Sequence, residues 1–519
     1  MLSVRICKEA KDLERIAIIN VETFKAKISV VETEENGFFR VVDQEVEEID
    51  MCLQPDSDMF LTKLQIDKAI KALRNLRRIC EMYHVNKTIA FATFAGGDEK
   101  PKNIHSFFEE VFNTCGLRFS VMNNADQNDL LYSGIVNTMD VPKGIICHIT
   151  SQAIHLIYYN RRLVIAEKVL PFGPLSLVEE FNLDAEHKDE NIEKIQQKVQ
   201  AELDNVALFT KLEGDFELVG SGDYFVDIAN IAKKIKKYPI DVINGYRMSL
   251  EDSSKVFNQI KLADIDKTRK IKGTSEARAD VFVASMIIAN TIMQKVGKTE
   301  AVIASRNFVE GVMFDNVIDL AKEKPLSDAM GFSMQSQVAF YDKENLKHNE
   351  QVYELSLLLY KQLRVLHKLP RFYTKVLRLA AYMHGCGERV SFPKTSKNGY
   401  NVLLGSDIYG VSHRELLLAA ITIALHTGCE FSVSDYIRFK DIITEEDIDA
   451  IKKLGVVVRI ADCLDRLRNS VIVDINCDVL GDSVIMKTIS MGDSSYEIVK
   501  ANEVCKEFER QFNKKIEVL

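Results

Sequence analysis

The stretch CHITSQAIH, residues 147–155, gathers side chains that could bind an anion or a metal ion. His148 and His155 offer imidazole nitrogens, and Thr150 and Ser151 offer hydroxyl groups between them. Hydroxyl donors suit phosphate oxygens, and imidazole is a common ligand of transition metals. Two histidines without a carboxylate or thiol partner rarely make a metal site, so we favour a turn that binds nothing. A new anion or metal site remains the alternative.

The apolar runs around this stretch predict two short strands joined by a tight turn. The centre of that turn, Thr150-Ser151-Gln152, contains no glycine and no proline. Turns of this kind usually need a residue that tolerates positive φ, so the composition is unusual for its position.

The bulk composition predicts a multidomain globular protein. The 519 residues are 46% hydrophobic and 28% charged, and a chain of this length usually divides into domains of about 100–200 residues. No apolar run approaches the roughly 20 residues that cross a bilayer, and the charged N-terminus is unlike an export signal. We therefore expect a cytoplasmic protein without a membrane partner.

Charge and cysteine usage exclude other classes. A net charge of −9 gives no global attraction for nucleic acid, so we expect no nucleic-acid partner, and any polyanion site must be local. The ten cysteines form no C-x-x-C pair, which favours buried reduced thiols over a zinc ribbon.

The elements that carry these residues fall into two similar α/β halves and a helical region. The order of expected elements in the first half is βββαβα, and the second half repeats three consecutive strands before helices with short strands between them. The next part is helical in period, and a small α/β unit with a Gly-Asp turn ends the chain. The predicted domains are residues 1–126, 127–320, 321–470 and 471–519, with a cleft between the two halves.

Five phrases resemble the exopolyphosphatase and guanosine pentaphosphate phosphohydrolase (Ppx/GppA) family. They are LPFGPLSL (170–177), LVGSGDYFVDIANI (218–231), EARADVFVASMII (276–288), ASRNFVEGVMFD (304–315) and VVRIADCLDRLR (457–468). The resemblance covers nearly the whole chain and implies an α/β fold. It consists of duplicated actin-like (ribonuclease H-like) ATPase-superfold lobes, an all-α HD-like domain and a small C-terminal α/β domain.

The resemblance also implies a chemistry. Family members release terminal phosphate from polyphosphate, or the 5′ phosphate of pppGpp, in the cleft between the lobes. Two glycine-rich turns hold phosphate and Mg²⁺, and a glutamate activates water. Glycines let phosphate oxygens approach backbone N–H groups, and a carboxylate holds the metal.

The first phosphate turn of the family, D-x-G-S-N-S, corresponds here to residues 20–25. The aspartate is replaced by Asn20 and the glycine by Glu22, whereas Thr23 keeps a hydroxyl. A carboxylate facing a phosphate is repulsive by several kcal/mol at an effective dielectric near ~20. Binding in the family's manner is therefore disfavoured; alternatively, Glu22 binds a cation or turns away.

The second phosphate turn, D-x-G-G-G-S-T-E-L, corresponds to residues 148–156. The aspartate becomes His148, the three glycines become Thr150, Ser151 and Gln152, and the glutamate becomes His155. A third phrase keeps its glycines at Gly220-Ser221-Gly222, where the family's second lobe approaches a phosphate tail, although Asp223 follows them.

The family's water-activating glutamates correspond to Asp126 and Gln127. Asp126 keeps a carboxylate that is one methylene shorter, which reduces the reach of a general base. The alternative is structural, because Asp126 is a natural N-cap for the helix that follows.

The helical domain also lacks one of the residues expected for its site. HD domains bind a metal through a histidine, a His-Asp dyad and a distant aspartate, and the corresponding residues are His348, His384-Gly385 and Asp462. Gly385 cannot ligate, Cys386 is a weak substitute and His426 is more typical of a packing residue. We expect HGCGERV to end a helix on glycine and the incomplete set to hold no metal.

We therefore expect a catalytically impaired or inactive family member with a binding or regulatory role. Its partners would be polyphosphate or guanosine polyphosphates, and the resemblance implies a homodimer. One alternative is an active exopolyphosphatase-type hydrolase, using Mg²⁺ and a rearranged site. Another is a sensor that binds such ligands without chemistry.

Overall fold

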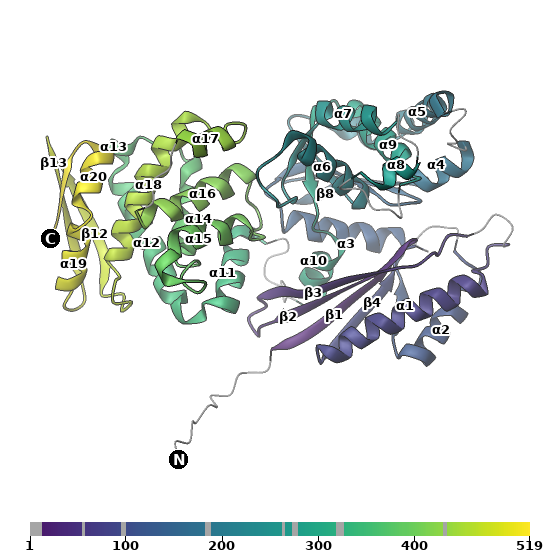
Figure 1. Cartoon of the computed structure of the whole chain (residues 1–519), viewed down its shortest axis with the longest axis horizontal. Helices are drawn as coiled ribbons and strands as arrows, with labels where there is room; N and C mark the ends of the chain where they lie inside the picture. The colour runs from purple at the N-terminus through teal and green to yellow at the C-terminus, as the bar shows by residue number, and fades with distance from the viewer. Residues whose placement is uncertain are drawn as a thin grey trace, which may run out of the picture. The chain divides into compact units, whose positions relative to one another are not determined.

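A computed structural model describes most of the chain, and it divides the chain into two compact units (Figure 1). The described residues are 13–53, 58–94, 100–181, 188–261, 265–271, 279–317, 326–428 and 433–519. The first unit contains residues 1–237 and 243–329, and the second contains residues 238–242 and 330–519. Residues 276–278 of the phrase at 276–288 lie outside the described residues. The composition of residues 321–337 predicts a linker; residues 321–325 lie outside the described residues, and the helix Ala329–Tyr341 covers most of the rest, so the prediction is wrong there.

The first sheet of unit 1 has the strand order β3-β2-β1-β4-β5. Strands β1 to β3 are antiparallel neighbours, and β4 and β5 continue the sheet in parallel with β1. The elements are β1 (Glu14–Val21), β2 (Lys25–Thr33), β3 (Phe39–Glu48), α1 (Lys63–Met82), β4 (Lys87–Ala92), α2 (Ile104–Cys115) and β5 (Phe119–Val121). This is the predicted βββαβα order, and the strand β5 follows it.

Local signals explain where the two helices of this lobe begin and end. Helix α1 begins with a capping box in which Thr62 and Gln65 bond each other's backbone N–H groups. These side chains satisfy donors that have no partner inside the helix. Helix α2 ends at Gly116, whose φ of 67° is left-handed, which is the usual conformation of a glycine that ends a helix.

The second sheet has the order β10-β11-β9-β6-β7-β8. Its strands are β6 (Lys143–Ile149), β7 (Ile154–Asn160), β8 (Leu163–Leu170), β9 (Glu217–Ser221), β10 (Arg247–Ser249) and β11 (Glu300–Ala304). The helices are α3 (Asn124–Val136), α4 (Pro174–Phe181), α5 (Lys188–Asp204), α6 (Asp223–Lys236), α7 (Leu250–Ile260), α8 (Ile265–Arg269), α9 (Phe282–Lys295) and α10 (Phe308–Val312). The sequence predicted helices at the places of α3, α5 and α9, but it did not predict the short strand β10 or the helices α4, α6, α7, α8 and α10.

The two sheets share one plan, which confirms the predicted duplication. In each, three antiparallel strands are followed by strands added in parallel to the first of them. Helices cross between the parallel strands, as they must because parallel strands cannot be joined by a tight turn. The hairpin that follows the first strand, β1–β2 in one lobe and β6–β7 in the other, therefore has the equivalent position in both sheets.

The second unit is a helical layer with a small sheet. Its helices are α11 (Ala329–Tyr341), α12 (Leu346–Gln362), α13 (Arg364–His367), α14 (Phe372–Met383), α15 (Thr395–Leu404), α16 (His413–His426), α17 (Val433–Phe439) and α18 (Glu445–Cys463). The C-terminal part contains β12 (Ile472–Val479), β13 (Ser483–Ser490), α19 (Ser495–Asn502), α20 (Cys505–Phe512) and β14 (Lys515–Val518). Strands β12 and β13 are antiparallel around the predicted Gly-Asp turn.

The segment 238–242 packs into the core of this second unit, far in sequence from its other residues. Ile240 is fully buried in the hydrophobic cluster that includes Leu377 and Leu417. The hydroxyl of Tyr238 lies 3.0 Å from Nδ1 of His413. The second unit is therefore discontinuous in sequence, whereas the sequence predicted one boundary at residue 320.

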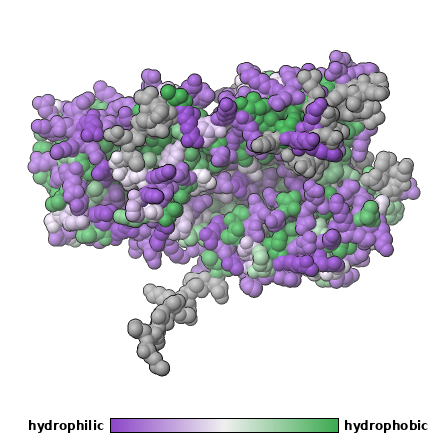
Figure 2. All heavy atoms as spheres, viewed as in Figure 1, coloured by the Kyte–Doolittle hydropathy of each residue, from purple (hydrophilic) through white to green (hydrophobic). Residues whose placement is uncertain are grey.

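The surface shown in Figure 2 is mainly hydrophilic, with hydrophobic residues scattered between polar ones. In the described part of the chain, no helix is both long enough and apolar enough to span a bilayer.

Candidate phosphate-binding pocket

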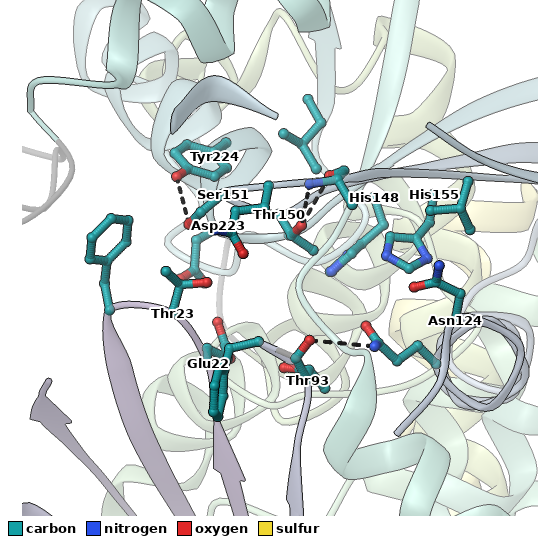
Figure 3. Close-up of a pocket in the computed structure, with 18 of the residues that line it drawn as sticks. Glu22, Thr23, Thr93, Asn124, His148, Thr150, Ser151, His155, Asp223 and Tyr224 are labelled. Atoms are coloured by element: carbon teal, nitrogen blue, oxygen red, sulfur yellow. Dashed lines mark hydrogen bonds between the residues drawn. The ribbon is translucent and has the colours of Figure 1, made fainter. Parts of the chain in front are cut away.

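A pocket of about 590 Å³ lies in unit 1, where the turns after the first strand of each sheet meet. Its walls come from the β1–β2 turn, the β6–β7 turn and the first residues of α3 and α6 (Figure 3). Its charged lining residues are the carboxylates Glu22, Glu179 and Asp223 and the ammonium groups Lys25 and Lys168. Carboxylates thus outnumber ammonium groups in the pocket.

An ion pair joins the two lobes at this pocket. The Lys25 ammonium group, at the start of β2, donates to the carboxylate of Asp223, at the start of α6. It also lies 3.4 Å from Oε2 of Glu22, in the turn before β2. Figure 3 shows Asp223 reaching toward the turn that carries Glu22 and Thr23. The positive charge nearest this turn is therefore held between two carboxylates.

Asn20 supports the first turn from outside the pocket lining. Its amide donates to Oε1 of Glu22 at 3.2 Å, and its amide oxygen accepts from Thr93 Oγ1 at 3.3 Å. Thr23 is buried but does line the pocket. The structure thus brings Glu22 and Thr23 to the pocket and uses Asn20 to hold the Glu22 carboxylate.

The environment of Glu22 raises the pKa of its carboxyl group. Burial is the main cause and Asp223 adds to it, whereas Lys25 opposes it. The folded protein then holds this proton more tightly than the unfolded chain, so the ionised carboxylate lowers the free energy of unfolding once the pH exceeds its ordinary pKa of 4.5.

We expect Glu22→Gln to raise the melting temperature at neutral pH and to have less effect in acid. The reason is that the wild-type carboxyl group regains its proton as the pH falls through its raised pKa. Thermal unfolding of both proteins over a pH series measures this. A lower melting temperature for Glu22→Gln than for the wild type at neutral pH would contradict the expected direction of the change.

The second turn is a four-residue hairpin loop whose hydroxyl groups already have partners. Thr150 Oγ1 donates to Ala153 O and accepts from Ala153 N, each at 3.0 Å. Ser151 Oγ lies 3.1 Å from the hydroxyl of Tyr224 in α6. None of the loop residues 150–153 has a positive φ, which explains why the loop needs no glycine.

The two histidines of this hairpin face different partners and do not form one ligand set. His148 Nδ1 lies 3.1 Å from Ser221 Oγ, and His155 Nδ1 lies 2.7 Å from Asn128 Oδ1. Their ring centroids are 6.0 Å apart. Burial lowers the pKa of His148 to about 3, with a further contribution from His155, and burial lowers the pKa of His155 to about 4. Both rings are neutral at physiological pH and contribute no positive charge for an anion.

The candidate catalytic residues lie at the start of α3. The prediction that Asp126 caps this helix is wrong, because the N-cap is Asn123, whose side chain accepts from the Asp126 N–H at 2.9 Å. Asp126 is exposed and is not among the residues that line the pocket. Gln127 is buried and lines it, but its amide donates to the carbonyl oxygens of Met122 at 3.2 Å and Thr93 at 3.4 Å.

The Gly220-Ser221-Gly222 phrase ends β9, and only its last residue reaches the pocket. A Cβ at Gly220 would lie 2.5 Å from the ring of Phe225, so this glycine permits packing. Ser221 is buried against His148. Gly222 precedes α6 with φ 91° and ψ 163°, a backbone conformation that is essentially restricted to glycine.

We expect Gly222→Ala to destabilise the protein by about 1–3 kcal/mol. The backbone conformation disfavours any side chain, and a Cβ would lie 2.6 Å from the carbonyl oxygen of Ile149. Urea unfolding measures the loss in the free energy of unfolding, read from the transition of the first unit. Gly297→Ala is the matched control, since Gly297 has φ +66° but no atom within 4 Å of an added Cβ. Equal losses for both variants would show that the contact with Ile149 has no effect.

Sequence reasoning did not assign a role to the residues that join the lobes here. Lys25 stands at the last position of the degenerate first turn, and Asp223 directly follows the Gly-Ser-Gly phrase. Their opposite charges, each in a phosphate-turn position, were the available signal. The sequence contained no signal that Tyr224 or Glu179 would line the pocket, because their positions depend on how α6 and α4 pack.

In the helical unit, the structure brings together His348, His384 and Asp462. The helix α14 ends at this phrase, as expected: its last residue is Met383, its C-cap is His384, and Gly385 follows without a positive φ. Gly387 is required for another reason, because a Cβ there would lie 2.3 Å from the carbonyl oxygen of Thr395. Cys386 is buried with Sγ 3.6 Å from Gly399 O.

The duplicated sheets of the two lobes define an actin-like, two-lobed fold. The chain belongs to the Ppx/GppA phosphatase family: the family model matches residues 30–319, and the model of Ppx/GppA phosphatase domain III matches residues 339–496.

Solved structures of similar fold and one curated protein match the chain at low sequence identity. An exopolyphosphatase structure from Cytophaga hutchinsonii aligns with a TM-score of 0.54 and 18% identity, covering 59% of this chain and 99% of that one. The Aquifex aeolicus family member aligns with a TM-score of 0.51 and 17% identity, covering 60% and 100%. A bifunctional 3-dehydroquinate synthase/phosphatase of Fusobacterium nucleatum is 21% identical over 329 residues, which are 60% of this chain and 48% of that protein. This chain thus spans about half the length of that curated relative.

Proposed function

We propose that this chain is a catalytically impaired member of its family, with a binding or regulatory role in polyphosphate or guanosine polyphosphate metabolism. The observation that carries the proposal is the ion pair between Lys25 and Asp223, with Glu22 beside it. Glu22 lies in the position of the family's first glycine-rich turn and Asp223 lies directly after the Gly220-Ser221-Gly222 phrase, and both carboxylates engage Lys25. Phosphate must compete with both carboxylates to reach Lys25.

The groups at the catalytic positions support the same proposal. A general base must accept a proton from its water within hydrogen-bond reach. The amide of Gln127 has no basic site, and its NH₂ group is directed to backbone carbonyls. Asp126 retains a carboxylate but does not line the pocket. Both observations support the proposal that neither residue activates water for attack on a phosphate in this pocket.

The Mg²⁺ ion that the family implies fits these residues poorly. Mg²⁺ requires oxygen ligands in near-octahedral geometry and is usually held by carboxylates and substrate phosphates. The family's aspartate positions are Asn20, which bonds Glu22, and His148, which is neutral and bonds Ser221. Of the three carboxylates that line the pocket, Glu22 and Asp223 are engaged by Lys25, which leaves Glu179 alone as a possible carboxylate ligand.

Other features favour an anionic ligand of moderate charge. Helices α3 and α6 begin at the pocket, and helix N-termini stabilise negative charge through their unpaired N–H groups. Lys168 adds an ammonium group to the lining. A short phosphate chain or a guanosine polyphosphate is the ligand class that we propose.

Phosphate release tests this proposal. Long-chain polyphosphate and pppGpp are incubated with the purified full chain and Mg²⁺ or Mn²⁺, and inorganic phosphate is measured. We expect no release above the protein-free blank, together with a thermal shift on adding tripolyphosphate or guanosine tetraphosphate. Release at ordinary enzyme rates that is lost in Asp126→Ala would overturn the impaired assignment. No thermal shift with either ligand would remove the binding role.

One observation favours the alternative of an active hydrolase with a rearranged site. Glu22 and Asp223 come from different lobes and lie close enough to share Lys25, and two carboxylates on opposite sides of a phosphate could hold a divalent cation if Lys25 moved away. The same assay distinguishes the two proposals, since metal-dependent release that Glu22→Gln abolishes would support the hydrolase.

A homodimer stays a prediction from the family resemblance. We expect light scattering coupled to size exclusion to give twice the chain mass of 58.9 kDa. A monomeric mass at all concentrations would contradict it.

A further inference from the structure

A second cluster of chemically reactive side chains lies in the helical unit, away from the pocket residues in sequence. Three helices contribute to it: His348 belongs to α12, His384 follows α14 and Asp462 belongs to α18. One ligand atom of each lies within 4.8 Å of the others. Both histidines are buried, and the Asp462 side chain is 21% exposed. Within the described ranges, no other group of three histidine, cysteine or acidic residues is arranged in this way.

The distances within the cluster fit a shared ion better than a set of direct hydrogen bonds. Nε2 of His348 lies 3.2 Å from Nε2 of His384 and 3.4 Å from Oδ1 of Asp462, and the third side of the triangle is 3.7 Å. Hydrogen bonds of this type usually have lengths near 2.9 Å. Metal–ligand bonds of about 2.1 Å at tetrahedral angles separate two ligand atoms by about 3.4 Å. The triangle has the dimensions of one face of a tetrahedral site.

The outer contacts of the histidines direct lone pairs into this triangle. His384 Nδ1 lies 2.8 Å from Ala381 O, which can only accept, so Nδ1 carries the proton and Nε2 of the neutral ring is a lone pair. His348 Nδ1 lies 2.8 Å from Oδ2 of the fully buried Asp465. Asp465 is held in turn by the Ser470 N–H at 2.7 Å. Carboxylates and carbonyls that orient the second ring nitrogen are characteristic of metal-ligating histidines.

Three acceptors that converge on one point need a cation between them. Two imidazole lone pairs and a carboxylate oxygen repel one another unless a proton or a metal ion lies inside the triangle. A single proton on His348 Nε2 could serve only part of the triangle, because it can make one short hydrogen bond at a time. A metal ion would be bonded by all three atoms at once.

Two further buried groups border the triangle. The His426 ring is 5.5 Å from the His384 ring, and its Nδ1 lies 2.7 Å from Ile423 O, which leaves Nε2 as its ligand atom. Asn349, next to His348, is 3% exposed, and no described residue donates a hydrogen bond to its Oδ1. That oxygen is 3.9 Å from the position of a Cβ on Gly385, which follows His384. An unpaired buried oxygen beside the cluster is suited to bond a water molecule on a metal ion.

The sequence led us to expect that this set, which lacks a ligand at Gly385, holds no metal; from the geometry we instead propose that the helical unit binds one divalent transition-metal ion through His348 Nε2, His384 Nε2 and the carboxylate of Asp462. His426 or a water molecule would complete the coordination. Two imidazoles and one carboxylate suit Zn²⁺, Fe²⁺, Mn²⁺ or Co²⁺, whereas Mg²⁺ prefers oxygen ligands alone. The ion would link α12, α14 and α18 inside one unit. This proposal does not depend on the activity of the pocket in unit 1.

Metal content tests the proposal directly. The full chain is produced without a polyhistidine tag, stripped with chelator and dialysed against Zn²⁺, Mn²⁺, Co²⁺ or, without air, Fe²⁺, and the bound metal is measured by mass spectrometry. We expect one ion per chain for at least one of these metals. With Co²⁺ we expect the visible absorption of a tetrahedral site, and chelator should lower the melting temperature of the loaded protein.

The variants separate a metal site from a proton-sharing network. His348→Gln, His384→Gln and Asp462→Asn should each lose the bound ion and the melting-temperature response to chelator, with circular dichroism showing that the helices persist. His367→Gln is the matched control. His367 is a buried histidine of the same unit whose Nε2 lies 2.7 Å from Tyr360 O and whose Nδ1 accepts from the Leu369 N–H. It should keep the ion.

Two results would overturn the proposal. One is a wild-type chain that takes up no stoichiometric metal from any of the four ions. The other is a set of ligand variants that retain as much metal as His367→Gln. If His384→Gln does not fold, Asp462→Asn decides the matter, because that side chain lies at the partly exposed edge of the cluster.

Discussion

The double variant Glu22→Gln/Asp223→Asn is expected to bind tripolyphosphate about tenfold more tightly than the wild-type chain. Both substitutions keep the size of the side chain and remove its charge. A unit charge about 8 Å from an anion contributes about 2 kcal/mol at an effective dielectric near 20, and solvent in the pocket reduces this value. The variant also releases Lys25 from both carboxylates, so that its ammonium group can meet the ligand.

Isothermal titration calorimetry measures the affinity, and two further variants interpret it. Lys25→Met should bind more weakly than wild type, because it removes the cation and leaves both carboxylates. Glu193→Gln/Glu202→Gln makes the same change in net charge on the exposed surface of α5. If that control gained as much affinity as the pocket variant, the effect would be a general attraction and the pocket would not be the binding site.

Asp447→Asn is expected to lower the free energy of unfolding of the helical unit by about 3 kcal/mol. Asp447 is fully buried in the first turn of α18 and serves several donors. Its carboxylate accepts from Arg414 at 2.8 and 3.1 Å, from the Tyr373 hydroxyl at 2.7 Å and from the Thr444 N–H at 2.7 Å. An asparagine keeps one acceptor oxygen and directs an NH₂ group at these donors, so hydrogen bonds are lost in a buried place.

The pH dependence gives this prediction a second measurement. Burial opposes ionisation of Asp447, but the hydrogen bonds from Arg414, Thr444 and Tyr373 outweigh it and lower the pKa. A lowered pKa means that the carboxylate stabilises the fold above its ordinary pKa of 3.8, and that this stabilisation is lost as the pH falls toward the lowered value. The difference between wild type and Asp447→Asn should therefore shrink in acid.

Asp449→Asn is the matched control for the same helix. The Asp449 side chain is 61% exposed. Among the described residues, its only ion pair is with Lys453, one turn later in the helix. Such exposed pairs contribute about 0.5 kcal/mol or less. Urea unfolding of both variants makes the comparison, and a loss for Asp449→Asn as large as that for Asp447→Asn would show that charge on α18, and not burial, sets the effect.

The sequence predicted the fold well because its signals are local. Alternating or continuous apolar runs marked β1 to β9 and β11, and the glycine at 116 marked the end of α2. The short strand β10 was missed because three residues, Arg247–Ser249, are too few for a periodic signal. Its place at the sheet edge depends on its pairing with β11, which lies about fifty residues further along the chain.

The site was predictable where it depended on residue type, and not where it depended on packing. The loss of glycines in the hairpin at 150–152 and the carboxylate at Glu22 could be read directly from the sequence. The ion pair between Lys25 and Asp223 could not, because it joins two lobes whose approach is set by tertiary contacts. The position of Asp126 could not be predicted either: the helix starts at Asn124, three residues earlier than a cap at Asp126 requires, and Asp126 does not line the pocket.

The small segment at residues 238–242 has a consequence for folding and for dissection of the protein. Because Ile240 completes the hydrophobic cluster of the second unit, a fragment that starts at residue 330 would leave an apolar void where Ile240 packs. The chain passes from one unit to the other three times, after residues 237, 242 and 329. A ribosome synthesises this segment long before the helices that enclose it. The second unit can therefore mature only after its C-terminal half arrives, and it cannot be isolated by cutting the chain at a single place.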